Sequence, residues 1–187
     1  RAKDAGRIHM KQYIVMSGVG KDRVGIVNRI AHGVASAGGN IEMQRAAKLA
    51  GDFAVIMLVS VDEDQTETGT VIDRLNKLST RDFAVTARKA FDFDDKSGES
   101  AIQAELAAEG ADQPGIIDAV TLFLVQKNIS LTTMDYDVAN APMTGTTLLQ
   151  LKARLSIPND VDVSGIENDL ADLERDLGIR ITVRIST

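Results

Sequence analysis

One stretch occurs twice in this chain: Gly20-Lys21-Asp22-Arg23-Val24-Gly25-Ile26-Val27 is matched, at an offset of 90 residues, by Gly110-Ala111-Asp112-Gln113-Pro114-Gly115-Ile116-Ile117. Later in each copy, Phe83-Ala84-Val85-Thr86-Ala87-Arg88 resembles Ile179-Arg180-Ile181-Thr182-Val183-Arg184 at an offset of 96. The second copy has therefore gained six residues in its later loops. Self-similarity of this kind predicts one structural unit present in two tandem copies.

Each copy shows the same order of strand and helix patterns. The first copy predicts strands at 11–17, 41–49, 53–61 and 83–90, a helix from the octet to Gly38-Gly39, and a second helix that carries Val71, Ile72, Leu75 and Leu78. A hairpin turn is predicted at Ala50-Gly51-Asp52. The second copy predicts strands at 102–108, 131–138, 146–155 and 179–185, with helices at about 115–127 and 163–177.

This element order predicts an α+β fold of two tandem ferredoxin-like βαββαβ units. Each unit would be a four-stranded antiparallel sheet with two helices on one face. The strand that contains Leu149 and Leu151 alternates apolar and polar residues, which is typical of one buried and one wet face. Residues 53–59 are apolar at every position, so both faces of that strand need cover. We expect the units to dock on each other, on a second chain, or both.

The predicted domain organisation follows from these patterns. Residues 1–10 are charged and lack periodicity, so we expect an expression leader or a disordered arm, with the native start at Met10. The two units occupy residues 11–91 and 101–187. The polar segment 92–100, rich in Asp, Ser and Gly, is the expected linker.

Composition excludes several classes of protein. The 187 residues include no cysteine and two histidines, which leaves no thiol chemistry and little for metal binding. The net charge of −6 argues against direct contact with nucleic acid, which draws on a positive surface. No apolar run reaches the roughly 18 residues of a membrane span. We expect a cytoplasmic protein that does not contact membranes, with no cofactor, no metal and no catalytic set.

The turn inside the octet has two interpretations, and both stay open. Gly25 and Gly115 lie at a predicted helix start, where free backbone N–H groups and the helix dipole favour an anion. The carboxylate of an amino acid suits those N–H groups, and Asp22 or Asp112 would then meet its ammonium group. Alternatively, the two Asp residues simply cap the helices, and Pro114 occupies a favoured position at a helix start.

Other polar residues carry weaker signals. His32 lies within a predicted helix without a second histidine, which indicates a structural role. Asp135 and Asp137 share one face of a predicted strand and are expected to be solvated. The loop 140–145 is longer than its counterpart and could gate or block a neighbouring site.

The two octets resemble a known motif. Asp22-Arg23-Val24-Gly25-Ile26-Val27 and Asp112-Gln113-Pro114-Gly115-Ile116-Ile117 are similar to the Asp-x-Pro-Gly-Ile turn of ACT domains. Gly39-Asn40-Ile41 and Asn128-Ile129-Ser130-Leu131 resemble the Asn-Ile pair with which the second strand of that family usually begins. The resemblance covers residues 11–187 in two copies. Tandem units without an attached enzyme are similar to the glycine-cleavage-system transcriptional repressor family.

The resemblance implies binding of an amino acid or a similar small ligand at an interface between paired units. Contacts would come from the first turn and the facing second strand. The residues implied are Asp22, Val24, Gly25, Ile26, Asn40 and Ile41 in the first copy, and Asp112, Pro114, Gly115, Ile116, Ser130 and Leu131 in the second. It further implies a homo-oligomer that acts through a protein partner, a DNA-binding regulator, without touching DNA.

The two copies depart from the motif in different ways. Val24 replaces the motif proline, Arg23 adds a cation beside it, and Ser130 replaces the usual asparagine, so the sites need not be equivalent. The leading hypothesis is a stand-alone regulator that senses a small ligand and acts as a co-regulator of glycine or amino-acid metabolism. The alternative is a structural interaction module without a ligand. An enzyme would need a catalytic set that the sequence does not offer.

Overall fold

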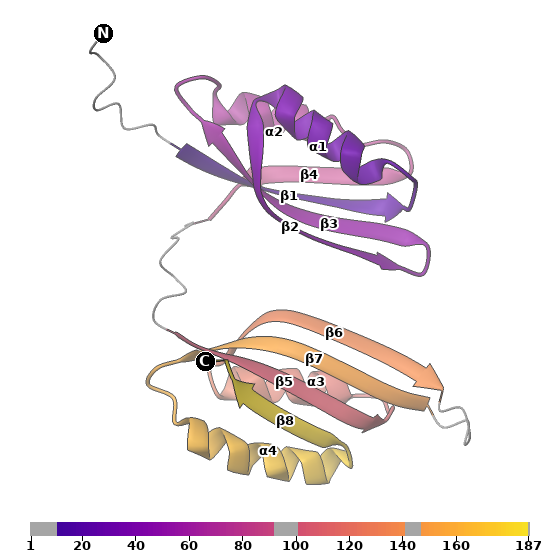
Figure 1. Cartoon of the computed structure of the whole chain (residues 1–187), viewed down its shortest axis with the longest axis vertical. Helices are drawn as coiled ribbons and strands as arrows, with labels where there is room; N and C mark the ends of the chain where they lie inside the picture. The colour runs from indigo at the N-terminus through magenta and orange to yellow at the C-terminus, as the bar shows by residue number, and fades with distance from the viewer. Residues whose placement is uncertain (1–10, 92–100, 141–146, 187) are drawn as a thin grey trace. The chain divides into compact units, whose positions relative to one another are not determined.

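A computed structural model describes residues 11–91, 101–140 and 147–186, and Figure 1 shows the chain. The chain divides into two compact units, Arg1–Asp94 and Asp95–Thr187. The expected leader 1–10 and linker 92–100 lie outside the described residues, as does the longer loop after Asn140 up to residue 146.

The first unit contains six elements in the predicted order. They are β1 (Lys11–Lys21), α1 (Ile26–Ala37), β2 (Gly39–Leu49), β3 (Asp52–Asp62), α2 (Thr68–Asn76) and β4 (Phe83–Lys89). The strands form one antiparallel sheet in the order β2-β3-β1-β4, and both helices cover the same face of it (Figure 1).

The second unit repeats this arrangement. Its elements are β5 (Ala101–Ala111), α3 (Ile116–Gln126), β6 (Ser130–Asn140), β7 (Thr147–Pro158), α4 (Val163–Leu177) and β8 (Arg180–Ile185). The sheet order is β6-β7-β5-β8, again antiparallel. The predicted fold class is thus confirmed, and the bounds of α4 match the prediction.

Each unit has its own apolar core between sheet and helices. Along β3, Val55, Met57, Val59 and Val61 are buried, and along β7 Leu149, Leu151, Ala153 and Leu155 are buried. From the helices, Ile30 and Val120 are almost completely enclosed. Burial at alternate strand positions is what the pleat requires when one face packs on helices.

The open faces of the two sheets differ, as the strand patterns predicted. In the first unit Ile56 is 51% exposed, and Val19 and Met43 are similarly exposed at 54% and 52%. In the second unit, Glu105 and Arg154 form an ion pair across β5 and β7, with N and O 3.7 Å apart. One open face is apolar and the other is charged.

Several boundaries differ from the predictions for physical reasons. β1 extends to Lys21, past its predicted end at residue 17. Gly18 and Gly20 have no apolar side chain, so the apolar pattern that predicts a strand stops before them. The prediction placed Leu78 in the second helix, but α2 ends at Asn76 and Leu78 lies after it. The Asn76 amide bonds the backbone N–H and C=O of Ala87 on β4, which turns the chain out of the helix.

The glycines of β1 allow β4 to approach. A Cβ built on Gly20 would lie 2.1 Å from the carbonyl oxygen of Asp82, and one on Gly18 would lie 2.6 Å from the Phe83 ring. In the second unit, Gly110 stands in the same relation to Ile179, with a Cβ contact of 2.6 Å. The first glycine of each octet is therefore required by packing between strands.

The structure confirms the predicted positions of two tight turns. Gly38 ends α1 in the left-handed conformation with φ 94°, and its N–H bonds back to helical carbonyls. Ala50 and Gly51 join β2 to β3 with φ of 49° and 94°, which is the conformation of a two-residue hairpin turn.

The Gly20 contact yields a stability prediction. Gly20→Ala should lower the free energy of unfolding by about 1–3 kcal/mol, because the added methyl group meets backbone that cannot move aside. Urea denaturation of the full chain measures this. Gly69→Ala is the control: its Cβ would meet nothing closer than 3.8 Å, and alanine should stabilise α2 by up to about 1 kcal/mol. Equal effects of the two variants would contradict the packing account.

Candidate ligand-binding turns

Each octet forms a tight turn between a strand and a helix. The N–H of Ile26 donates to the carbonyl of Arg23 at 3.2 Å, and Gly25 has φ 86° and ψ 2°. These angles define the third residue of a type II turn, where glycine is needed, and proline suits the position before it. Gly115 has φ 94° and ψ −4°, and Pro114 precedes it. The Pro-Gly part of the motif is therefore explained by the backbone conformation of the turn.

The capping interpretation of the two Asp residues is wrong. The N-cap residues are Gly25 and Gly115, and neither helix has a side-chain cap. The type II turn places two residues between each Asp and the cap residue, so neither Asp occupies the N-cap position. Pro114 likewise lies in the turn, before the first helical residue, Ile116.

The two carboxylates instead bond to the second strand of their own sheets. Asp22 Oδ2 lies 2.6 Å from the Lys48 ammonium on β2. Asp112 Oδ1 accepts a hydrogen bond of 2.5 Å from the Tyr136 hydroxyl on β6. This hydrogen bond raises the pKa of Tyr136, because the carboxylate holds the phenolic proton. Asp22 thus meets a cation, whereas Asp112 meets a neutral donor.

A pocket of about 220 Å³ adjoins the turn of the first unit. Its lining residues are Lys21, Arg23, Val24, Gly25, Ile26, Arg29, Thr80, Asp82 and Phe83. Arg23 forms an ion pair with Asp82, which ties the turn to the segment before β4. The pocket therefore holds three cationic side chains and one carboxylate.

A pocket of about 430 Å³ adjoins the turn of the second unit. Its lining residues are Asp112, Gln113, Pro114, Gly115, Ile116, Ile117, Asp118 and Tyr136. Gln113 bonds the carbonyl of Leu177 at 2.6 Å, as Arg23 bonds the corresponding segment in the first unit. The lining carries two carboxylates and no cation.

The remaining predicted site residues lie at the opposite end of each sheet. Asn40 pairs with Ser60, which pairs with Tyr13, so Asn40 stands nine strand positions before Asp22. At about 3.3 Å per residue this is roughly 30 Å. Ile41 lies next to Asn40, and Ser130 and Leu131 occupy the equivalent end of β6. Neither unit brings its turn and its second-strand residues together.

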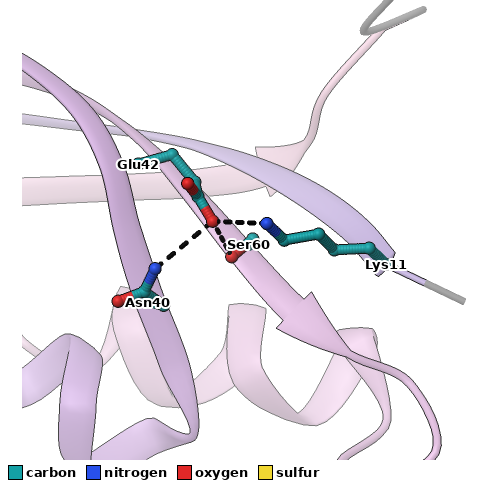
Figure 2. A network of polar contacts seen from close by, with 4 residues as sticks. All are labelled: Lys11, Asn40, Glu42 and Ser60. Atoms are coloured by element: carbon teal, nitrogen blue, oxygen red, sulfur yellow. Dashed lines mark hydrogen bonds and ion pairs between the residues drawn. The ribbon is translucent and has the colours of Figure 1, made fainter. Parts of the chain in front are cut away.

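Asn40 belongs to a polar network that the sequence did not predict (Figure 2). One oxygen of Glu42, Oε1, accepts from Asn40 Nδ2 at 3.2 Å and from Ser60 Oγ at 2.6 Å, and lies 2.7 Å from Lys11 Nζ. The β2–β3 register shifts between Ile41 and Met43, so Glu42 is the extra residue of a β-bulge. A bulge is not visible in the apolar pattern, which explains why Glu42 was missed.

The network has a clear electrostatic effect. The Lys11 ammonium, followed by the Ser60 hydroxyl and the Asn40 amide, lowers the pKa of Glu42 to about 2. Glu42 in turn raises the pKa of Lys11. The second unit has a bulge at the same place, but its extra residue is Thr132. The ionised network is therefore particular to the first unit.

Other predicted polar residues show no site. His32 is exposed on α1 and lies 3.5 Å from the Ser36 hydroxyl. Asp135 and Asp137 are exposed on β6. Over residues 11–91, 101–140 and 147–186, no group of three or more histidines and carboxylates could hold a metal ion.

Comparison with known proteins finds a family match within the first unit. Residues 12–86 match the family model of the ACT domain. The chain is also 48% identical, over 50 residues, to the glycine cleavage system transcriptional repressor of Escherichia coli (strain K12), and equally to that of Shigella flexneri. This segment is 27% of the chain and spans about a quarter, 26%, of the repressor's length.

Two solved structures share the fold of this chain over both units. The chain matches a protein of unknown identity from Galdieria sulphuraria with a TM-score of 0.80 and 29% identity, over 95% of this chain and 99% of the other. It matches a candidate glycine cleavage system transcriptional repressor with a TM-score of 0.66 and 20% identity, over 95% and 99%. The tandem arrangement is thus shared along nearly the whole chain.

None of the helices that the structure describes has the length and apolar character needed to cross a membrane.

The Glu42 network yields a pH prediction. Glu42 has a pKa of about 2 in the folded chain, below the ordinary 4.5, so its contribution to stability is present above pH 4.5. This contribution should disappear as the pH falls from 4.5 to 2. In thermal melts between pH 2 and 7, Glu42→Gln should therefore melt below the parent at neutral pH and converge with it near pH 2. Lys11→Gln should show the same convergence, and parallel curves would contradict the assignment.

Proposed function

We propose that this chain is a regulatory protein, and not an enzyme, that binds a small amino acid at the turn of its second unit and signals through a protein partner. The match of residues 12–86 to the ACT domain model and the sequence similarity to transcriptional repressors of the glycine cleavage system support this role. The proposed output is co-regulation of genes for glycine or amino-acid metabolism.

The observation that carries the proposal is the environment of Asp112. Its carboxylate lines the pocket, and the side-chain donor that reaches it from the described residues is the Tyr136 hydroxyl. Beside it α3 begins at Gly115 without a side-chain cap. An amino acid would place its ammonium group on Asp112 and its carboxylate on the first N–H groups of α3.

The first unit is less suited to the same ligand. Lys48 already supplies an ammonium group to Asp22, at 2.6 Å. A free amino acid would have to displace this chain-borne cation before its own ammonium could reach the carboxylate. In the copy that departs from the motif, the Asp22 carboxylate is thus already paired with Lys48. The second unit is therefore the proposed amino-acid site.

The proposed partners follow from charge and from the placement of the second-strand residues. The net charge of −6 favours a protein, such as a DNA-binding regulator, over DNA itself. Asn40, Ile41, Ser130 and Leu131 stand far from the turn of their own unit. They would contribute to a turn site only from another unit, and we propose that a homo-oligomer supplies it.

A second candidate function is an interaction module without a ligand. The observation that favours it is the apolar open face of the first sheet. Val15, Leu58 and Met43 lie side by side across that face, next to the exposed Ile56. Large contiguous patches of exposed apolar residues are typical of surfaces that bind another protein. This candidate predicts no response to any amino acid.

A thermal-shift panel of the twenty amino acids separates the two candidates. A ligand at about 100 times its Kd stabilises the folded state by about 2.7 kcal/mol. We expect a rise of several degrees in Tm with one or a few small amino acids. No shift with any of them at millimolar concentration would leave the interaction module as the better account.

Substitution of the turn carboxylates locates the site. Asp112→Asn should weaken amino-acid binding at least about tenfold in isothermal titration, because the ammonium group loses a charged partner in the pocket. Asp22→Asn is the matched control and should bind as the parent does. Loss of binding in Asp22→Asn with retention in Asp112→Asn would place the amino acid in the other unit.

A further inference from the structure

The two turn pockets carry opposite charge although their backbones are repeats. The first pocket is lined by Lys21, Arg23 and Arg29 against Asp82, a net charge of two positive. The second is lined by Asp112 and Asp118 without a cation, a net charge of two negative. The first pocket is positive in a chain whose net charge is −6, so its sign does not follow from overall composition.

Two cations of the first pocket are free for a ligand. Arg23 is engaged by Asp82. In the described part of the chain no carboxylate pairs with Lys21 or Arg29, and Arg29 lies over the Phe83 ring with its guanidinium 5.9 Å from the ring centre. An ammonium and a guanidinium on one small pocket attract an anion.

The walls of this pocket are held by core packing and backbone hydrogen bonds. Phe83 is only 3% exposed and packs against Gly18. The backbone N–H of Lys21 donates to the carbonyl of Asp82 at 2.9 Å, and the N–H of Thr80 donates to the carbonyl of Phe83 at 2.8 Å. The β1 end and the segment 80–83 are thus held together by backbone bonds, which preserves the shape of the pocket.

The lining also contains an apolar part. Val24 is fully exposed at the turn, and Ile26 and Phe83 border the same pocket. A volume of about 220 Å³ is below the roughly 300–1,000 Å³ of drug-sized sites. This combination suits an anion that carries a short hydrocarbon chain.

The second unit shows what the same fold looks like without these groups. At the repeat offsets, Ala111 replaces Lys21, Gln113 replaces Arg23, Ala119 replaces Arg29 and Gly178 replaces Asp82. Every charged side chain of the first pocket has been exchanged for an uncharged one. The fold does not need these charges, because the second unit adopts the same topology without them.

We infer that the pocket at Lys21, Arg29, Thr80 and Phe83 binds a small anion with a short apolar chain, and that the second unit does not take this ligand. The inference rests on the proposed function of the turns as ligand sites and adds a second ligand class to it. Lys21 and Arg29 would bind the anionic group, and Val24 and Phe83 would contact the hydrocarbon.

The test uses four probes with four carbon atoms each on the ¹⁵N-labelled full chain. Butyrate and monobutyl phosphate are anions, butyramide is neutral, and 2-aminobutyrate is the zwitterion. We expect butyrate or monobutyl phosphate to shift the amide resonances of Gly25 and Ile26, and the stronger of the two identifies the anion as carboxylate or phosphate. Butyramide should leave them unchanged, and added salt should weaken the response.

Variants make the assignment specific. Arg29→Ala, which gives the first unit the residue found in the second, should weaken anion binding at least about fivefold, and Lys21→Gln with Arg29→Ala more than tenfold. Lys152→Gln, on the open face of the second sheet, is the charge-matched control and should change nothing. Thermal melts verify that each variant is folded, and anion affinity unchanged in the folded double variant would overturn the inference.

The two proposals fail in distinguishable ways. Shifts of Gly115 and Ile116 by 2-aminobutyrate, with no response of Gly25 to either anion, would retain the amino-acid site and overturn the anion pocket. Response of Gly25 to anions without any response to 2-aminobutyrate would support the anion pocket and count against the amino-acid site. Equal response of both turns to butyrate would overturn the inferred difference between the units.

Discussion

The positive φ of Gly25 and Gly115 is the constraint on which both candidate sites depend. This backbone conformation turns each chain from a strand into a helix within a few residues, and it leaves the first N–H groups of the helix without a side-chain cap. It also carries the neighbouring Asp toward the second strand of the sheet. One conformational requirement of glycine thus shapes the helix end, the position of the carboxylate and the pocket beside them.

Much of this fold could be predicted from sequence because it is repeated. The octets and the later matching segments fixed the two units and the order of their elements, and the apolar spacing of α4 gave its bounds. β1 was predicted too short, because Gly18 and Gly20 carry no apolar side chain and their role is visible only against Phe83 and Asp82.

The candidate site was harder to predict because it depends on geometry that spacing does not encode. Asp22 and Asp112 have the sequence of a helix cap, and only the type II turn shows that they bond to Lys48 and Tyr136 instead. Motif order alone also did not show that Asn40 would stand at the far end of the sheet from Asp22. The bulge that exposes Glu42 follows from strand register, which side-chain polarity does not reveal.

The close approach at Gly20 and Gly110 has an evolutionary consequence. The residues that fix the pocket walls are glycines and core side chains, which tolerate little change, whereas the lining positions 21, 23 and 29 are exposed and can vary without disturbing the core. After a duplication, this division between constrained wall residues and variable lining residues would allow the two copies to acquire different ligand preferences. The positions that can vary line the candidate pockets, so the proposed ligand preference of a unit can change through a few substitutions.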